Sequence, residues 1–206
     1  MATTTTNYGW DIPQSTDLVK DGATAIATLG QDIDTSIYTA LGGNKSGMVH
    51  LSTVAFSGVA THSVNDVFTS AYENYKVLIR YTDTSAGANL NIRFRVAGVD
   101  AAGASTYKYV EQDSTTTVTA LRGNSTQGVI GNSANTATQL NTSAIDIFSP
   151  ALATATAWNC FALSNTSSGL MRLTAGNHAV ATAYDGFTII STGTISGKVY
   201  VYGYSF

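Results

Sequence analysis

The stretch Tyr75-Lys76-Val77-Leu78-Ile79-Arg80-Tyr81-Thr82 decides the fold of this chain. Its odd-numbered positions are all apolar or aromatic and the positions between them are mostly polar, which is the period of two of a half-buried β-strand. Residues 90–97 repeat this alternation, and residues 83–89 between the two runs are rich in Asp, Ser, Gly and Asn, which favour turns. The two runs together predict a β-hairpin.

The predicted hairpin would gather four basic side chains. Arg93 and Arg95 share one face of the second strand, and Lys76 and Arg80 would lie across from them on the first. One interpretation is an ordinary solvated sheet face. The other is a contact patch for an acidic partner subunit or an anionic glycan.

Further strand-like runs occupy the rest of the chain after residue 48. They are short and separated by Gly, Ser and Asn, and they cover residues 51–56, 106–111, 117–121, 144–148, 157–163, 170–174, 186–190 and 197–204. No segment among them has the period of a helix. We therefore expect a mainly β domain over residues 44–206, an antiparallel β-sandwich of the jelly-roll type.

The last of these strands is apolar on both faces. Val199 and Val201 lie on one face, and the aromatic residues at positions 200, 202, 204 and 206 lie on the other. Such a strand is either central and covered or pressed against a neighbouring subunit. A platform on which sugars stack is a further alternative for the aromatic face.

Residues 1–43 form a separate predicted domain, an anchor arm followed by an oligomerisation helix. Ser15-Thr16-Asp17 is a helix-start cluster, and Gly42-Gly43 is expected to end the helix. Between these ends the apolar residues of one narrow stripe are Val19, Ile26, Leu29, Ile33 and Ile37.

The predicted helix needs a partner that covers this stripe. Gly22 and Gly30 each cost about 1 kcal/mol relative to Ala, whereas full burial of one stripe residue returns roughly 1.5–3 kcal/mol. Two interpretations stay open: packing on the chain's own β-domain, or a bundle with the same helix of sister chains in a homotrimer. The regular spacing of Val19, Ile26 and Ile33 favours the bundle.

The composition excludes several classes of protein. Charged residues make up only 11% of the chain, and the net charge is −3, so the basic footprint of a nucleic-acid-binding protein is missing. No apolar run is long enough to span a bilayer, and we expect no membrane insertion. Residues 1–6 lack the basic and apolar regions of a signal peptide, and Cys160 is the single cysteine, so we expect assembly in a cytoplasm.

Catalytic and cofactor-binding motifs do not occur in the sequence. His50, His62 and His178 have no metal-ligand spacing, and neither a G-x-S-x-G elbow nor a phosphate-binding loop is present. We therefore predict no cofactor, no metal site and no enzymatic activity. The alternative from the enzyme class is a glycan depolymerase, which would need two carboxylates about 5–10 Å apart in a groove.

The segment Asn7-Tyr8-Gly9-Trp10-Asp11-Ile12-Pro13-Gln14-Ser15-Thr16-Asp17 and the helix after it resemble the N-terminal segment of many structural proteins of tailed-bacteriophage virions. The order of an aromatic residue, Pro, Ser/Thr-Asp and then the apolar helix positions carries the resemblance, which covers roughly residues 1–40. A looser similarity to phage β-sandwich modules lies in Arg93-Phe94-Arg95 and in residues 197–203.

This resemblance implies a virion component, commonly trimeric, with an N-terminal anchor and an outward-facing β-domain, and it brings no catalytic residues. The leading hypothesis is a homotrimeric fibre or tail-associated protein whose partners are other virion proteins of the tail, portal or capsid, with a host-surface glycan as a further partner. The alternative is a capsid decoration protein, whose basic patch would face an acidic capsid. A carbohydrate-binding module without a virion is disfavoured by the N-terminal segment.

Overall fold

The computed structural model describes residues 3–12, 18–40, 47–83, 89–114, 118–132, 139–164 and 169–205. The chain divides into two compact units, Met1–Gly47 with Ser205–Phe206, and Met48–Tyr204. The predicted boundary after residue 43 and both predicted helix-end clusters, at residues 15–17 and 42–43, lie outside the described residues.

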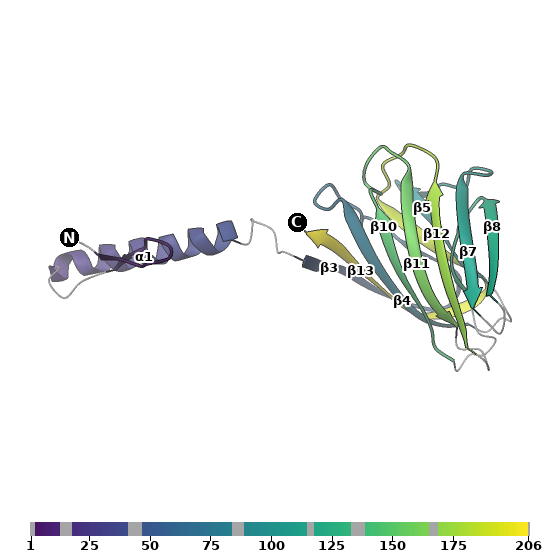
Figure 1. Ribbon diagram of the computed structural model, residues 1–206, viewed down its shortest axis with the longest axis horizontal. Helices are drawn as coiled ribbons and strands as arrows, with labels where there is room; N and C mark the ends of the chain where they lie inside the picture. The colour runs from purple at the N-terminus through teal and green to yellow at the C-terminus, as the bar shows by residue number, and fades with distance from the viewer. Residues whose placement is uncertain are drawn as a thin grey trace. The chain divides into compact units, whose positions relative to one another are not determined.

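The first unit combines a helix with a short N-terminal arm. Helix α1 spans Val19–Ala40, where the apolar stripe predicts it. In the arm, strand β1 (Thr3–Thr4) pairs antiparallel with β2 (Asp11–Ile12), as Figure 1 shows. The indole Nε1 of Trp10 donates a hydrogen bond to Ser36 Oγ at 2.9 Å, and its ring stacks on that of Tyr8. The arm is therefore fastened to the C-terminal half of α1.

The second unit consists of antiparallel strands, which confirms the prediction of a mainly β chain with one N-terminal helix. The strands are β3 (Gly47–Val64), β4 (Asn74–Asp83), β5 (Asn89–Val96), β6 (Val99–Asp100), β7 (Tyr107–Ser114), β8 (Val118–Ser125), β9 (Gly128–Asn132), β10 (Asn141–Phe148), β11 (Thr156–Ser164), β12 (Leu170–His178) and β13 (Gly186–Ser205). Each predicted strand run falls within or across one of these elements.

The strands form one curled sheet in the order β6-β5-β13-β4-β10-β11-β12-β7-β8, with β3 paired to β13 and β9 to β5 (Figure 1). Residues 186–190 and 197–204, predicted as two strands, both belong to the 20-residue β13. The first part of β13 pairs with β5, where Gly186 is opposite Arg95, and the later part pairs with β4, where Val201 is opposite Val77. Strand β13 is thus central, as one of the two interpretations of its apolar faces expects.

The predicted hairpin between residues 75–82 and 90–97 is wrong. Among the described residues, β4 and β5 form no ladder with each other, because both pair with β13 instead. The alternation in the sequence identifies which side chains face inward, but it does not identify the neighbouring strand. Val199 and Val201 of β13 present the same inward apolar pattern to β4 that the predicted partner would have presented.

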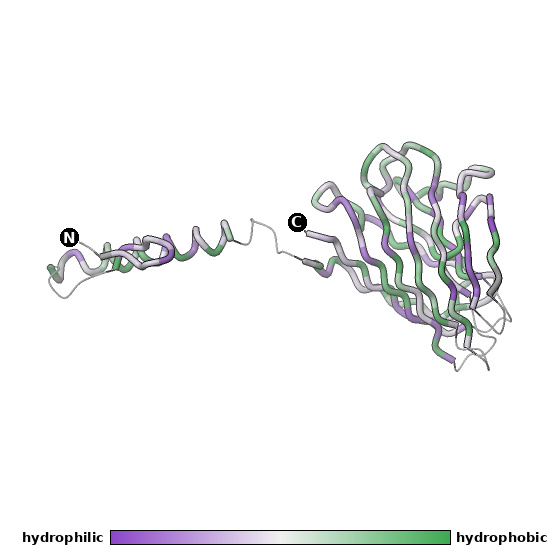
Figure 2. Tube along the Cα trace, viewed as in Figure 1, coloured by the Kyte–Doolittle hydropathy of each residue, from purple (hydrophilic) through white to green (hydrophobic). Residues whose placement is uncertain are grey.

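The curl brings β9 against the inner face of β11 and encloses the core. Cys160 Sγ lies 3.0 Å from the carbonyl oxygen of Ile130 on β9, and Trp158 is 1% exposed between Gly128 of β9 and Gly176 of β12. Along the strands, buried apolar residues alternate with more polar outward ones, as the changing colours in Figure 2 show. The outward face of the central strands is therefore the surface left for partners.

Candidate functional site

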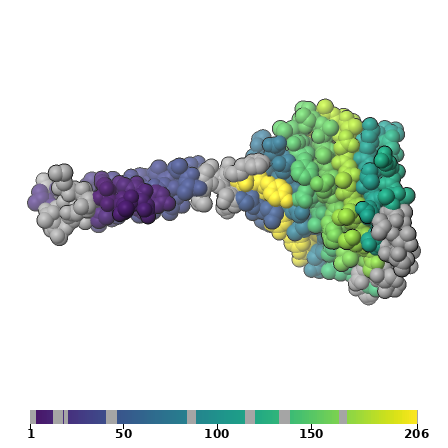
Figure 3. All heavy atoms as spheres, in the orientation of Figure 1, coloured from purple at the N-terminus to yellow at the C-terminus, as the bar shows by residue number. Residues whose placement is uncertain are grey.

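Five neighbouring strands, β4, β10, β11, β12 and β7, present one continuous surface, which we call the outer face (Figure 3). Because their registers are unbroken, the outward side chains form rows across the sheet. One row consists of Leu78, Ala144, Phe161, Leu173 and Gln112. The next row consists of Lys76, Asp146, Asn159, Ala175 and Val110.

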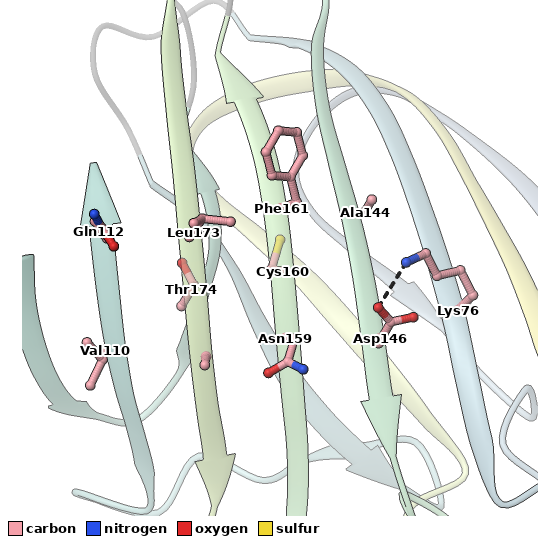
Figure 4. A pocket seen from close by; sticks show the side chains of 11 residues that line it. Lys76, Val110, Gln112, Ala144, Asp146, Asn159, Cys160, Phe161, Leu173 and Thr174 are labelled. Carbon is pink, nitrogen blue, oxygen red and sulfur yellow. Dashed lines mark hydrogen bonds and ion pairs between the residues drawn. The ribbon is translucent and has the colours of Figure 1, made fainter. Parts of the chain in front are cut away.

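All members of these two rows except Leu78 line a hollow of about 410 Å³ on the outer face (Figure 4). The small side chains of Ala144 and Ala175 leave the space open. Around them stand Phe161, Leu173 and Val110, which are 50%, 43% and 47% exposed. The hollow therefore combines apolar walls with a floor that belongs to the rigid centre of the sheet.

Polar side chains reach the same hollow. The amides of Asn159 and Gln112 are exposed, and each can both donate and accept hydrogen bonds. Lys76 Nζ lies 2.9 Å from Asp146 Oδ2, as the dashed line in Figure 4 marks. These are the two charged residues that line the hollow, and they neutralise each other.

Tyr204 completes this ion pair from β13. Its hydroxyl donates a hydrogen bond to Asp146 Oδ1 at 2.6 Å. Burial, together with the neighbouring Asp146 carboxylate, raises the pKa of Tyr204 to about 12. The phenol thus stays protonated near neutral pH and holds Asp146 in place, so that one of the tyrosines singled out in the sequence supports the hollow from its side.

The structure does not gather the predicted basic patch. Lys76 is opposite Tyr202 of β13 and Arg93 is opposite Thr188, which are 14 positions apart, or roughly 45 Å along an extended strand. Arg93 Nε donates to the carbonyl oxygen of Thr126 at 3.1 Å. The arginines of β5 are therefore occupied within their own part of the sheet.

The two remaining members of the predicted patch also have separate surroundings. Arg95 Nη1 lies 2.9 Å from Asp100 Oδ1. Arg80 is exposed directly opposite Lys198, a residue that the sequence analysis left out of the patch. The structure thus pairs Arg80 of β4 with Lys198 of β13 in place of the predicted patch.

The predicted oligomerisation stripe of α1 is incompletely covered. Leu29 and Ile33 are half-buried, whereas Ile26 is 66% and Ile37 is 53% exposed. Ser36, which binds Trp10, lies on the Leu29 side of the helix, because residues seven apart share a face. The arm therefore follows one flank of the stripe, and Ile26 and Ile37 stay accessible. Val19 opens the helix, but its side chain lies outside the described part.

A buried charge cluster occupies the inner face. Arg172, which is 5% exposed, makes two hydrogen bonds to the carboxylate of Asp113, from Nε at 2.5 Å and from Nη2 at 2.6 Å. Its Nη1 lies 3.3 Å from Glu111 Oε2 and donates to Asn89 Oδ1 at 2.7 Å. Burial raises the pKa of Glu111, and the positive charge of Arg172 opposes this. This cluster ties β12 and β7 to β5.

Two other groups with chemical potential are buried as well. His178 is 1% exposed, its Nδ1 lies 2.8 Å from the Tyr184 hydroxyl, and burial lowers its pKa. Burial raises the pKa of Cys160 to about 12, so the thiol is protonated and unreactive near neutral pH. The described residues contain no group of three or more His, Cys, Asp or Glu side chains that could hold a metal ion.

Of the side chains that line the hollow, the sequence pointed to Lys76 as a contact residue and to none of the others. Residues 157–163 carry a signal for the other side chains. Trp158 and Cys160 are apolar residues on one face of this run, and Phe161 and Leu163 are large apolar residues on the other face. A strand with large apolar side chains on both faces indicates that its outer face also contacts another molecule or another part of the chain.

Comparisons with known proteins leave the family of this chain open. No family model and no curated protein matches the sequence. One similar solved structure is a fructofuranosidase variant from Schwanniomyces occidentalis complexed with fructosylnystose, at 6% identity and a TM-score of 0.21. The match covers 76% of this chain and 34% of that chain, and a likeness of this degree supports no argument about activity. No helix in the part of the chain that the structure describes is long and apolar enough to cross a membrane.

Proposed function

We propose that this chain is a non-enzymatic structural component of a tailed-bacteriophage virion, mounted by its N-terminal segment as a homotrimeric fibre or tail-associated protein. The observation that carries the proposal is the accessible apolar stripe of α1. Ile26 and Ile37 are each more than half exposed. Covering each of them would contribute roughly 1.5–3 kcal/mol, so three helices that meet along this stripe stabilise one another.

The finer architecture belongs to the same proposal. Three copies of α1 form a parallel bundle, and the curled sheet acts as a jelly-roll sandwich displayed outward from it. The close approach of β9 to β11, through Cys160 and Ile130, supports two facing layers within the curl. The arm is attached to each helix by the hydrogen bond from Trp10 to Ser36, so it covers one side of the helix and leaves the stripe free for the other two helices.

A structural role also fits the position of two carboxylates on the inner side of the sheet. Glu111 and Asp113 both face the guanidinium of Arg172 on the inner side of the sheet. A glycan depolymerase would require two carboxylates that face an open groove. The arrangement around Arg172 instead resembles an internal cross-link, in which Arg172 makes two hydrogen bonds to Asp113 and an ion pair with Glu111.

The second candidate, a capsid decoration protein, is favoured by one observation. Arg80 and Lys198 are exposed directly opposite each other on neighbouring strands, where like charges repel. An acidic surface of a capsid protein would relieve this repulsion. Binding of the purified protein to empty capsids that weakens with salt, and that is lost in Arg80→Ala, would favour decoration over the fibre.

The assembly is tested by multi-angle light scattering of the variant with Ile26→Asp and Ile33→Asp. We expect the trimer mass to fall to that of the monomer, or the protein to aggregate, because burying a charge in the apolar contact between the three helices is costly. The matched control carries Ala27→Asp and Thr35→Asp, at exposed positions of the same helix away from the stripe. A trimer that survives the stripe substitutions would contradict the bundle.

The virion role is tested on intact particles. Antibodies against the chain, labelled with gold, are expected to mark the tail or its fibres in electron micrographs. Labelling over the whole capsid shell would favour decoration instead. Particles that carry no label, while the antibody recognises the free chain, would contradict the proposal in both forms.

A further inference from the structure

We propose that the hollow on the outer face is a binding site for a neutral sugar unit, an inference that rests on the proposed outward display of the β unit. The hollow is built by Phe161 and Asn159 of β11, Leu173 and Ala175 of β12, and their neighbours on β10 and β7 (Figure 4). Its charge, its surface chemistry, its size and its rigidity each restrict the occupant.

The charge of the hollow favours an uncharged ligand. Lys76 and Asp146 form an ion pair at 2.9 Å, and the Tyr204 hydroxyl occupies the second oxygen of Asp146. An anionic ligand would have to compete with Asp146 for Lys76, and a cationic ligand with Lys76 for Asp146. A neutral ligand enters without breaking this pair.

The surface chemistry favours a molecule that is apolar on one side and rich in hydroxyl groups at its edge. The ring of Phe161 is half exposed and offers an apolar π face, against which the C–H face of a pyranose packs. Asn159 and Gln112 supply amides that both donate and accept, and a sugar hydroxyl also does both. An alkyl chain would leave these amides without partners.

The size of the apolar surface argues against a second copy of the chain as the occupant. The exposed apolar side chains of the outer face are Val110, Phe148, Phe161, Leu163, Met171 and Leu173. They span four strands and four rows, or about 14 Å by 20 Å, an area of roughly 300 Å². A stable protein interface buries about 800 Å² on each partner. The hollow of about 410 Å³ instead falls in the range of small-ligand sites.

The site is also rigid before any ligand binds. Strands β10, β11 and β12 are paired along both edges, and each pair keeps an unbroken register. Cys160 and Thr174, which are buried, support the hollow from beneath. A preformed site of this kind loses little conformational entropy when it binds a weakly held, solvated ligand such as a sugar.

The test is saturation-transfer NMR on the full-length protein. The probes are the methyl glycosides of glucose, galactose, mannose and N-acetylglucosamine, with methyl glucuronide as the anionic comparison. We expect transfer to at least one neutral glycoside, strongest at the C–H protons of one ring face. Phe161→Ala is expected to weaken the binding about tenfold or more, which corresponds to the loss of an aromatic contact, and Asn159→Ala is expected to weaken it as well.

Phe148→Ala is the matched control, because Phe148 is a phenylalanine exposed on the outer face of β10 but outside the hollow. It is expected to bind the glycoside as the unchanged protein does. Transfer to no neutral glycoside, preference for the glucuronide, or equal binding by the Phe161→Ala variant would each overturn the proposal. A lower assembly mass for Phe161→Ala in light scattering would also overturn it, because the hollow would then be covered by a second copy.

These outcomes are separable from a failure of the proposed function. The trimer mass and the gold labelling of particles depend on α1 and on the virion, and Phe161→Ala leaves both unchanged if the hollow binds sugar. A trimer found on particles that binds no sugar contradicts the hollow alone. A monomer absent from particles that still binds sugar through Phe161 contradicts the virion role alone.

Discussion

Trp158 shows how single residues fix the curl of the sheet. Its indole fills a space bounded by Gly128 on β9 and Gly176 on β12. A Cβ atom added at either glycine would lie 2.4 Å from Trp158 Cζ2, which is far inside van der Waals contact. The absence of two side chains thus lets the facing strands close on the largest residue of the core.

Gly176→Ala is expected to lower the free energy of unfolding by about 1–3 kcal/mol, because the added methyl group must displace the buried indole or the nearby Lys108 carbonyl oxygen, which would be 2.7 Å away. The urea midpoint measures this change. Ala175→Val, at the adjacent outward position, adds more volume but is expected to stay within about 0.5 kcal/mol. Equal urea midpoints for Gly176→Ala and the unchanged protein would show that the core beside Trp158 accommodates a methyl group, which would contradict the prediction.

Glu111 gives a pH-dependent prediction at the same scale. Burial raises its folded pKa above the usual 4.5, so its contribution to stability is full below pH 4.5 and is lost as the pH rises through the folded pKa. Gln does not titrate, and Arg172 keeps its two hydrogen bonds to Asp113. The stability of Glu111→Gln relative to the unchanged protein is therefore expected to increase from acid to neutral pH. Urea midpoints across this range would refute the prediction if the difference stayed constant or fell.

Single residues also show what sequence patterns resolve. Alternation correctly identified Tyr75, Val77 and Ile79 as inward-facing, since they are 0–2% exposed. It did not show that Phe161 faces outward, because both faces of residues 157–163 are apolar and alternation alone does not say which of them is the inner one. Registry with Leu173 and Gln112, which makes Phe161 part of a hollow, comes from strand pairing over long sequence separations.

At the scale of elements, β13 shows why strand existence was predictable and strand pairing was not. Residues 191–196 have the composition of a turn, Ser-Thr-Gly-Thr-Ile-Ser, yet they lie inside one continuous strand. The ladder to β5 ends with Ile190 opposite Asn91, and the ladder to β4 begins with Ile195 opposite Asp83, so the strand is fixed on both sides of residues 191–194. Tertiary pairing thus overrides local turn preference.

Removal of residues 199–206 is expected to abolish soluble expression. This part of β13 pairs with β4, and Val199 and Val201 are fully buried. The loss would expose the apolar inner face of β4 and leave its edge unpaired, which favours aggregation. Removal of residues 205–206 alone is the control and is expected to leave the yield unchanged. A soluble and folded product of the longer deletion would show that this strand is peripheral.

At the scale of the whole molecule, the two units differ in what they leave uncovered. The hydrophobic core of the β unit is closed by residues between Phe56 and Val201, all of them within that unit. In the first unit, Ile26 and Ile37 of α1 remain exposed. Stability of the fold and assembly of copies are therefore expected to reside in different parts of the chain.

This division predicts that a fragment of residues 48–206 folds as a monomer. Its core loses no member when residues 1–47 are removed, so a cooperative thermal transition close to that of the full chain is expected in calorimetry. Without α1 it lacks the apolar stripe, so light scattering is expected to give the monomer mass. The full-length variant with Ile26→Asp and Ile33→Asp provides the comparison, since it keeps the arm and the helix but no longer has an intact apolar stripe. A fragment that stays trimeric would place the assembly interface in the β unit, and a fragment that does not fold would show that its core depends on the N-terminal unit.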